Sequence, residues 1–262
     1  MLIWKVLRRF LLIFTVFAMM SPVAGVFGQG RKVLNLPKYD YYPYHFGFTL
    51  GLNQMNFTIK PAADIDTRVY EKVYNETGTL VADSLMVMGV NSDPTFGFDI
   101  GIVGDKRLGK YFNVRFVPAL SFGERYINYS IKRWDKGTIS MIDVKKNVGS
   151  VFIDFPVLFK YKSKRLNNML AYVTAGGKYS MDIASNARKK DQNEDVVVKL
   201  EKHDIYAIVG VGFDFYNPWF KLGVELKMSY GFNDMLKRDN TFFTQSIEKL
   251  NSKVFQLGLT FE

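Results

Sequence analysis

Apolar and polar side chains alternate with a period of two along most of the chain, and this pattern constrains the fold more than any other feature. One stretch reads TFGFDIGIVG, in which Phe96, Phe98 and Ile100 are separated by small or polar residues. A period of two places successive side chains on opposite faces of a β-strand. The pattern occurs in eight stretches, at 44–59, 95–104, 111–132, 148–162, 169–185, 203–216, 220–232 and 253–261. The sequence therefore predicts an all-β fold of eight two-faced strands.

The connections between these stretches alternate in length. Those at 60–94, 133–147, 186–201 and 233–250 are long and polar, whereas those at 105–110, 163–168 and 217–219 are short. Each stretch is long enough to cross a bilayer, which takes a tilted strand about 9–11 residues. Short turns on one side and long loops on the other are typical of outer-membrane barrels. We therefore expect an eight-stranded antiparallel up-and-down transmembrane β-barrel in the outer membrane of a Gram-negative bacterium, with both termini periplasmic and the long loops extracellular.

Glycine on the polar face of the strands indicates which face points inward. The glycines on that face are Gly47, Gly51, Gly97, Gly101, Gly210, Gly212, Gly223 and Gly231. On a solvated face glycine only weakens a strand, whereas inside a narrow eight-stranded barrel it relieves crowding between large side chains. A soluble barrel with an apolar interior is the alternative. We expect the outer face, with Phe46, Phe98 and Leu222, to contact lipid.

The N-terminal segment has the three-part layout of a secretory signal peptide. Basic Lys5, Arg8 and Arg9 precede the apolar run FLLIFTVFAMM, which is followed by SPVAGVFGQG. The run is shorter than the ~20 residues of a membrane-spanning helix, although an uncleaved anchor is the alternative. We predict a signal peptide at 1–28 with an approximate cleavage position, a periplasmic N-terminal segment at 29–43 that is a tether or docking peptide, and the barrel at 44–262.

Residues able to carry chemistry are sparse. The chain has no cysteine and two histidines, and its net charge of +10 is a modest basic excess. Thiolate sites are therefore excluded, and no nucleic acid is expected as a partner. His45 and His203 are predicted at opposite ends of the barrel, and no GxSxG motif is present. We predict no catalytic, metal or cofactor-binding residue, and a structural role for His45.

Charges of both signs fall on the face predicted to point inward. They are Asp99, Arg115, Glu124, Asp154, Lys160, Lys178, Asp182, Asp214, Glu225 and Lys227. The lumen of an eight-stranded barrel is just wide enough for side chains to fill it, and buried charges need partners. We expect these residues to pair and fill the lumen; an ion path or a ligand site is the alternative.

Aromatic residues are predicted to form belts where the strands meet the two membrane interfaces. The periplasmic set is Tyr41, Tyr42, Tyr44, Tyr111, Phe112, Tyr161, Phe215, Tyr216, Trp219 and Phe261. The outer set is Phe57, Tyr129, Trp134, Tyr230 and Phe232. Ordinary strand propensity of aromatic residues is the alternative explanation.

The stretch YDYYPYHFGFTLGLNQMNFTI at 39–59 follows the predicted signal peptide and a short basic linker, and it resembles the opening of the PorT family. The later stretches NVGSVFIDFPVLFKYKSKRLNN and AYVTAGGKYSMDIAS fit that family in spacing and length, so the resemblance covers essentially the whole mature chain. It implies an integral outer-membrane protein of the type IX secretion system, needed to export cargo proteins and, in gliding relatives, motility adhesins. No catalytic residue is carried over.

We expect a non-enzymatic barrel that supports export through protein–protein contacts. Its partners would be outer-membrane lipid and other type IX secretion components, with no cofactor and no small-molecule substrate. The loops at 60–94 and 186–201 are candidate docking surfaces, and within the first, Val69–Val73 and Leu80–Val90 could extend a hairpin beyond the membrane. Two other functions stay open: a small barrel enzyme acting on lipid, and a bare-barrel adhesin or structural protein.

Overall fold

The computed structural model describes residues 33–74, 80–184, 198–239 and 241–262. Asn35–Glu262 forms one compact unit. The predicted signal peptide at 1–28 lies outside the described residues. Among the described residues, no helix has both the length and the apolar character needed to span a membrane.

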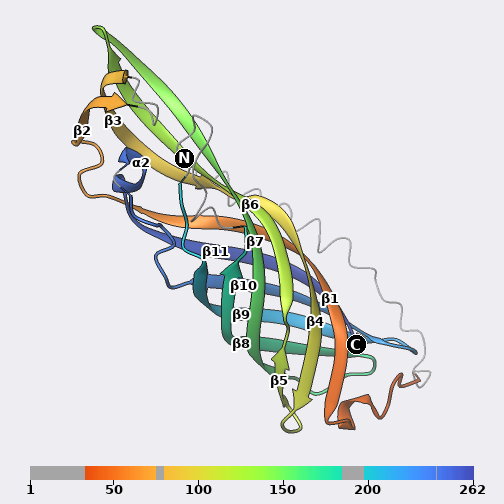
Figure 1. The fold of residues 1–262 in the computed structure, drawn as a ribbon. Coiled ribbons are helices and arrows are strands. Elements are labelled where there is room, and N and C mark those ends of the chain that lie inside the picture. The colour runs from red at the N-terminus through yellow and green to blue at the C-terminus, as the bar shows by residue number, and fades with distance from the viewer. Residues whose placement is uncertain (1–32, 75–79, 185–197, 240) are drawn as a thin grey trace, which may run out of the picture. The chain divides into compact units, whose positions relative to one another are not determined.

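The unit Asn35–Glu262 consists almost entirely of antiparallel strands (Figure 1). The strands are β1 (Tyr44–Pro61), β2 (Val69–Tyr74), β3 (Leu80–Asp93), β4 (Thr95–Arg107), β5 (Phe112–Phe116), β6 (Ala119–Asp135), β7 (Thr138–Lys162), β8 (Met169–Asp182), β9 (His203–Tyr216), β10 (Lys221–Gly231) and β11 (Ile247–Phe261). Two short helices, η1 (Tyr39–Tyr41) and α2 (Phe242–Gln245), accompany them. Each predicted stretch overlaps a strand, and the structure divides 111–132 into β5 and β6; β2 and β3 lie within the predicted connection 60–94.

Eight strand positions close into a ring. The ring runs through β1, β4, β5 with β6, β7, β8, β9, β10 and β11, and β11 pairs again with β1. β5 and β6 share one position because Val117 and Pro118 interrupt a single run of strand; proline has no N–H to donate. Pro94 separates β3 from β4 in the same way. The ring confirms the predicted eight-stranded antiparallel barrel.

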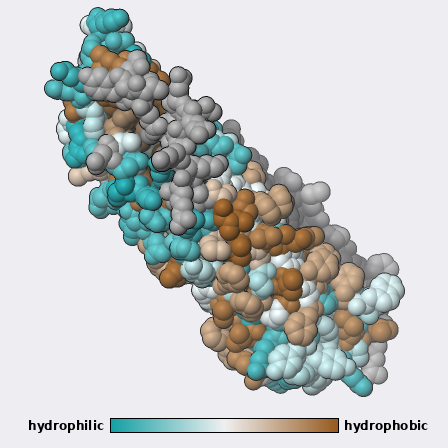
Figure 2. All heavy atoms as spheres, viewed as in Figure 1, coloured by the Kyte–Doolittle hydropathy of each residue, from teal (hydrophilic) through white to brown (hydrophobic). Residues whose placement is uncertain are grey.

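The apolar face of the strands points outward, as predicted. The side chain of Phe46 is 73% exposed and that of Phe96 is 77% exposed, and Phe98 is exposed as well. Figure 2 shows brown, apolar residues gathered over the ring strands on one face of the molecule, and teal, polar residues beyond them. A soluble barrel with an apolar interior is therefore wrong for the ring.

Glycines make room for the large polar side chains inside the ring. A Cβ atom added to Gly212 would lie 2.5 Å from Cζ of Tyr172, and one added to Gly51 would lie 2.5 Å from a carboxylate oxygen of Asp99. A real side chain at either position would displace the neighbour. These contacts explain why glycine recurs on the inward face.

We call the end of the ring with the turns 108–111, 163–168 and 217–220 the turn end, and the opposite end the loop end. At the loop end the interior changes from polar to apolar. A core of buried side chains, the loop-end core, fills it: Phe57, Leu85, Val87, Val90, Ile127, Tyr129, Ile131, Val148, Val198, Leu200, Met235, Leu236, Phe243, Ile247 and Leu250. The assignment of Phe57 and Tyr129 to an outer aromatic belt is therefore wrong, because both point inward. Tyr216, assigned to the other belt, is buried too.

Strands continue past the ring at the loop end. The predicted extension at Val69–Val73 and Leu80–Val90 is confirmed by β2 and β3, which pair with each other. The predicted long loop at 133–147 is wrong, because β6 and β7 continue as a ribbon joined by the two-residue turn Lys136–Gly137. Both turn residues have positive φ, 47° and 80°, as tight hairpin turns require. The predicted loop at 233–250 contains α2 and the start of β11, and most of 186–201 lies outside the described residues.

Candidate functional site

Arg115, on β5, is the centre of the charge network at the turn end of the lumen. Its side chain is buried, and its guanidinium nitrogens lie 2.6 Å from Oε1 of Glu262 and 3.2 Å from Oδ2 of Asp105. A third nitrogen lies 3.7 Å from Oε2 of Glu225. The planar guanidinium has five donors. This one cation therefore contacts three carboxylates: Asp105 on β4, Glu225 on β10 and Glu262, which follows β11.

Two lysines complete the network at the same level. Lys160 Nζ lies 2.7 Å from Oδ2 of Asp214 and 3.6 Å from the centre of the Tyr172 ring. Lys221 Nζ lies 3.7 Å from the same Asp214 oxygen and also pairs with the Glu262 carboxylate. Buried charges are tolerated when each has a partner, and here the cations and carboxylates share partners around the ring.

Further into the lumen the pairing continues around Asp154. Its carboxylate accepts hydrogen bonds from Ser121 at 2.8 Å, from Lys178 at 3.0 Å and from Ser180. A small cavity of about 20 Å³ lies beside it, which is room for about one water molecule. The lumen at this level is therefore filled by side chains, as predicted.

Arg125, on β6, lies where the polar lumen meets the loop-end core. It donates hydrogen bonds to Ser252 at 2.7 Å and to Ser150 at 2.6 Å. Its guanidinium carbon lies 4.3 Å from the centre of the Phe57 ring, and a nitrogen lies 3.8 Å from Asp182. The sequence analysis did not place Arg125 in the lumen. The residue lies four positions after Ser121 on the same strand, so the alternation points both side chains inward.

Glu124 is the one predicted lumen residue that the structure contradicts. Its side chain is exposed on the outer face of β6, where it accepts a hydrogen bond from the Tyr126 hydroxyl at 2.7 Å. Even-numbered residues of β6, such as Phe122, point outward, so Glu124 follows the alternation and its polarity misled the assignment. The other nine predicted residues lie inside the lumen.

The segment Asn35–Tyr42, which we call the end segment, lies against the turn end of the barrel. Asn35 donates a hydrogen bond from its side chain to the backbone oxygen of Tyr216 at 2.9 Å, and its backbone N–H donates to Asn168 at 2.9 Å. Arg165 donates to the backbone oxygens of Asn35 and Leu36. Residues 35–42 of the predicted periplasmic segment are therefore held against the barrel by hydrogen bonds.

Tyr39 and Asp40 connect the end segment to the lumen charges. The Tyr39 hydroxyl donates to Oε2 of Glu262 at 3.1 Å, and the Tyr216 hydroxyl donates to Asp40 at 2.8 Å. Asp40 also lies 3.7 Å from Arg165. Burial and the adjacent Glu262 carboxylate raise the pKa of the Tyr39 phenol well above its usual range, so Tyr39 stays a donor at neutral pH.

The two histidines lie at opposite ends of the barrel. His45 is buried at the turn end, where Nε2 lies 2.8 Å from the backbone oxygen of Tyr39 and the ring stacks on the Tyr39 ring at 4.2 Å. His203 opens β9 on the outer face, 2.7 Å from the Tyr179 hydroxyl. The two rings share no site. Among the described residues, no group of three or more His, Cys, Asp or Glu side chains is arranged to hold a metal ion.

A match to a family model agrees with the barrel geometry. A family model described as outer membrane protein β-barrel domain matches residues 29–237. No curated protein sequence matches the chain.

Solved structures similar to this chain include three outer-membrane proteins. Neisserial surface protein A has 10% identity and a TM-score of 0.38, covering 84% of this chain and 98% of that chain. OprG from Pseudomonas aeruginosa has 11% identity and a TM-score of 0.36, covering 82% and 92%. The attachment invasion locus protein Ail of Yersinia pestis has 10% identity and a TM-score of 0.34, covering 84% and 99%.

The family match spans most of the chain, and the ring, its apolar outer face and its polar, charge-filled lumen are what a membrane-spanning barrel requires. The chain belongs to the outer membrane protein β-barrel domain family and is an outer-membrane protein.

Proposed function

We propose that this barrel is a non-enzymatic component of the type IX protein secretion system, supporting export of cargo through protein–protein contacts. The observation that carries the proposal is the filled lumen, in which Arg115, Asp154 and Arg125 occupy successive levels with their partners. A barrel filled in this way offers cargo no route through its described residues, so its contribution to export would come from its outer surfaces. The resemblance of 39–59 to the PorT family supplies the link to secretion.

The proposed orientation places the turn end in the periplasm and the loop end outside the cell. Short turns characterise the periplasmic side of outer-membrane barrels, and the turns 108–111, 163–168 and 217–220 lie together at one end. The end segment would then be periplasmic, and the β6–β7 ribbon extracellular. Outer-membrane lipid would surround the apolar face of the ring.

The alternative of a lipid-modifying enzyme has less support from the geometry. His45 is buried against Tyr39, and His203 lies at the other end of the barrel. An adhesin would use the same loop-end surfaces as a secretion component, so the two functions differ in the partner and not in the part of the barrel that binds it.

A deletion strain tests the proposal. Loss of the gene should trap secreted cargo in the periplasm while the outer membrane stays intact to detergents and dyes, and in a gliding bacterium it should stop motility. Re-expression of the protein should restore export. Normal secretion in the deletion strain would contradict the proposal, and altered outer-membrane lipid that is restored by wild type but not by His45→Ala would favour the enzyme.

A further inference from the structure

Two neighbouring turns at the turn end repeat the same three residues. Lys-Arg-Leu occurs at 106–108, where β4 ends, and again at 164–166, just after β7. β5, which follows the first turn, pairs with β7, and the Lys162 N–H donates a hydrogen bond to the Tyr111 oxygen at 2.7 Å. The two Lys-Arg-Leu sequences therefore lie on adjacent parts of the same end of the ring.

The three side chains have the same arrangement in both turns. Each arginine donates a hydrogen bond to a backbone oxygen of the end segment, at 3.2 Å in both cases. Leu108 is 57% exposed and Leu166 is 71% exposed, and the two lysines are exposed as well. Each turn thus uses its arginine within the protein and presents a lysine and a leucine to the surroundings.

The exposed lysines lie beside tyrosine rings at the edge of the lipid-facing surface. Lys106 Nζ lies 5.6 Å from the centre of the Tyr44 ring, and Lys110 Nζ lies 5.3 Å from the centre of the Tyr111 ring. Tyrosines at the end of a membrane-spanning barrel lie at the depth of the lipid headgroups, and lysines there extend their amines toward the same depth. We call Lys106, Lys110 and Lys164 the lysine rim.

The carboxylates of the turn end do not neutralise the lysine rim. In the part of the turn end that the structure describes, four side chains carry a carboxylate: Asp40, Asp105, Asp214 and Glu262. Each of them pairs with a lumen cation or with Arg165. The negative charge of this end is therefore directed into the barrel, and the lysine rim leaves an excess of positive charge on its outside.

The lysine rim occupies one arc of the ring, from β4 to the turn before β8. At the turn ends of β9, β10 and β11, no described lysine or arginine is exposed. Lys221 begins β10, but its side chain is buried and lies 3.7 Å from Asp214. The exposed side chains on that arc are aromatic, and Trp219 is 86% exposed. An anion attracted by the lysine rim would therefore be held on one side of the barrel.

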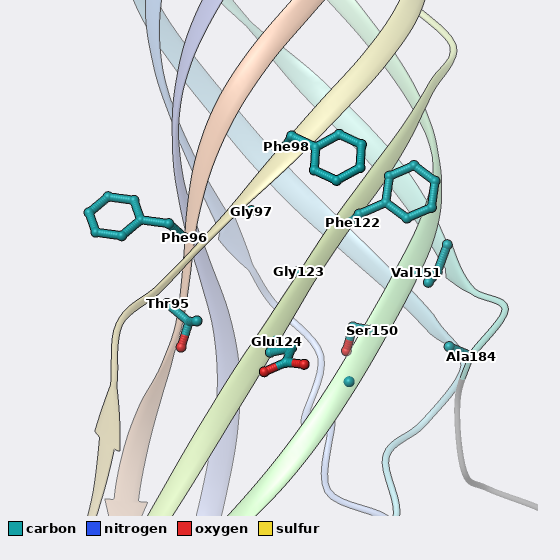
Figure 3. A pocket seen from close by; sticks show the side chains of 11 residues that line it. Thr95, Phe96, Gly97, Phe98, Phe122, Gly123, Glu124, Ser150, Val151 and Ala184 are labelled. Carbon is teal, nitrogen blue, oxygen red and sulfur yellow. The ribbon is translucent and has the colours of Figure 1, made fainter.

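The lipid-facing wall near the loop end offers a contrasting environment. A surface hollow of about 600 Å³ there is lined by Phe98, Phe122 and the Glu124 carboxylate (Figure 3). No lysine or arginine is among the described residues that line it. A phosphate group at this wall would meet a carboxylate of its own charge, whereas at the lysine rim it would meet cations.

We propose that the lysine rim binds the phosphate groups of anionic phospholipids in the leaflet at the turn end, with Leu108 and Leu166 inserted beside the lipid headgroups. A basic group near a membrane surface is attracted to anionic lipid, and exposed leucines beside the lysines favour a lipid over a soluble anion. The inference goes beyond the secretion proposal and does not depend on it. In the proposed orientation this leaflet is the inner one.

Lipid binding to the full chain tests the inference. The protein is folded in neutral detergent micelles, dioleoyl-phosphatidylglycerol or dioleoyl-phosphatidylcholine is added, and bound lipid is counted by native mass spectrometry. Phosphatidylglycerol should bind at least about tenfold more tightly than phosphatidylcholine, and the preference should shrink as salt is raised. Replacing all three residues of the lysine rim by glutamine should remove the preference. Equal binding of the two lipids by the wild-type protein would overturn the inference.

A matched triple variant separates the lysine rim from net charge. Lys132→Gln, Lys136→Gln and Lys249→Gln together remove the same charge at the loop end, and this protein should keep the preference. Equal loss in the two triple variants would show an effect of net charge only and would overturn the inference.

Cross-linking locates the bound lipid. A phosphatidylglycerol with a photoreactive headgroup should mark 106–112 and 161–166, and marking confined to the loop end would overturn the inference. Full competition by glycerol phosphate would assign the lysine rim to a soluble phosphate. Binding of a polyglutamate peptide without any lipid preference would assign it to an acidic protein. Either result would overturn the inference as well, and the deletion strain tests the secretion proposal independently of all these outcomes.

Discussion

The guanidinium carbon of Arg125 lies 4.3 Å from the centre of the Phe57 ring, and the Phe152 ring lies 5.0 Å from the same carbon. The cation therefore contacts two aromatic rings while its edge donates to Ser150 and Ser252. A guanidinium can combine ring contacts with hydrogen bonds in its own plane. Arg125 thus contacts both the polar lumen, through its hydrogen bonds, and the loop-end core, through the Phe57 ring.

We expect Arg125→Ala to destabilise the barrel by about 3–5 kcal/mol, because it leaves the buried Asp182 without its nearby cation. Urea unfolding of protein folded in micelles measures the change. Arg133→Ala is the matched control: its pair with Asp135 is partly exposed, so the loss should be under about 1 kcal/mol. Equal unfolding midpoints for the two variants would contradict the role given to Arg125.

Alternation predicted most of the ring because a two-residue period is a local property of the chain. The same alternation also gives the correct orientation for the residues whose side chains were assigned to the wrong face. Glu124 shares the outward parity of Phe122, and Phe57 shares the inward parity of Asn53. Residue type was given more weight than parity in both cases, since a carboxylate was assumed to need the lumen and a phenyl ring the lipid. At the loop end these assumptions fail, because the interior there is itself apolar.

The partners within the lumen could not be predicted from alternation. Arg115 and Glu262 are 147 positions apart in the sequence, and their contact depends on the tilt and stagger of strands around the ring. Those quantities are set by ring closure and not by any single strand. The length of the β6–β7 ribbon was missed for a different reason: polar residues suggested a loop, although a strand outside a membrane can be polar on both faces.

Tyr39→Ala should release the end segment. The substitution removes the stack on His45 at 4.2 Å and the hydrogen bond to Glu262 at 3.1 Å. We expect trypsin to cut after the exposed Lys38 about tenfold faster, which corresponds to about 1.4 kcal/mol of lost local stability. Mass spectrometry of timed digests measures the rate. Tyr41→Ala is the control, because that side chain is 73% exposed, and an equal acceleration there would count against the role of Tyr39.

The barrel should not conduct ions. Charges fill the lumen at the level of Arg115 and again at the level of Asp154, so protein inserted into planar bilayers should give no stable current steps. Arg115→Ser should stay closed as well, because the network around Asp154 does not depend on Arg115. A porin in the same bilayers serves as the positive control. Steady conductance from the wild-type protein would show that the lumen opens.

Gly212→Ala should test the crowding of the lumen. The added methyl would lie 2.5 Å from Cζ of Tyr172 and 2.8 Å from the backbone oxygen of Val224. The second of these atoms belongs to a paired strand and cannot move far, so we expect destabilisation of about 1–3 kcal/mol in urea unfolding.

Gly258→Ala is the matched control for Gly212→Ala, because it places the same methyl group on another strand of the same ring. A Cβ there would lie 3.7 Å from Oγ1 of Thr49 and 3.8 Å from the backbone oxygen of Glu225, which are ordinary contact distances. Its unfolding free energy should stay within about 0.5 kcal/mol of the wild-type value. Equal unfolding free energies for the two alanine variants would contradict the conclusion that Gly212 makes room for the Tyr172 side chain.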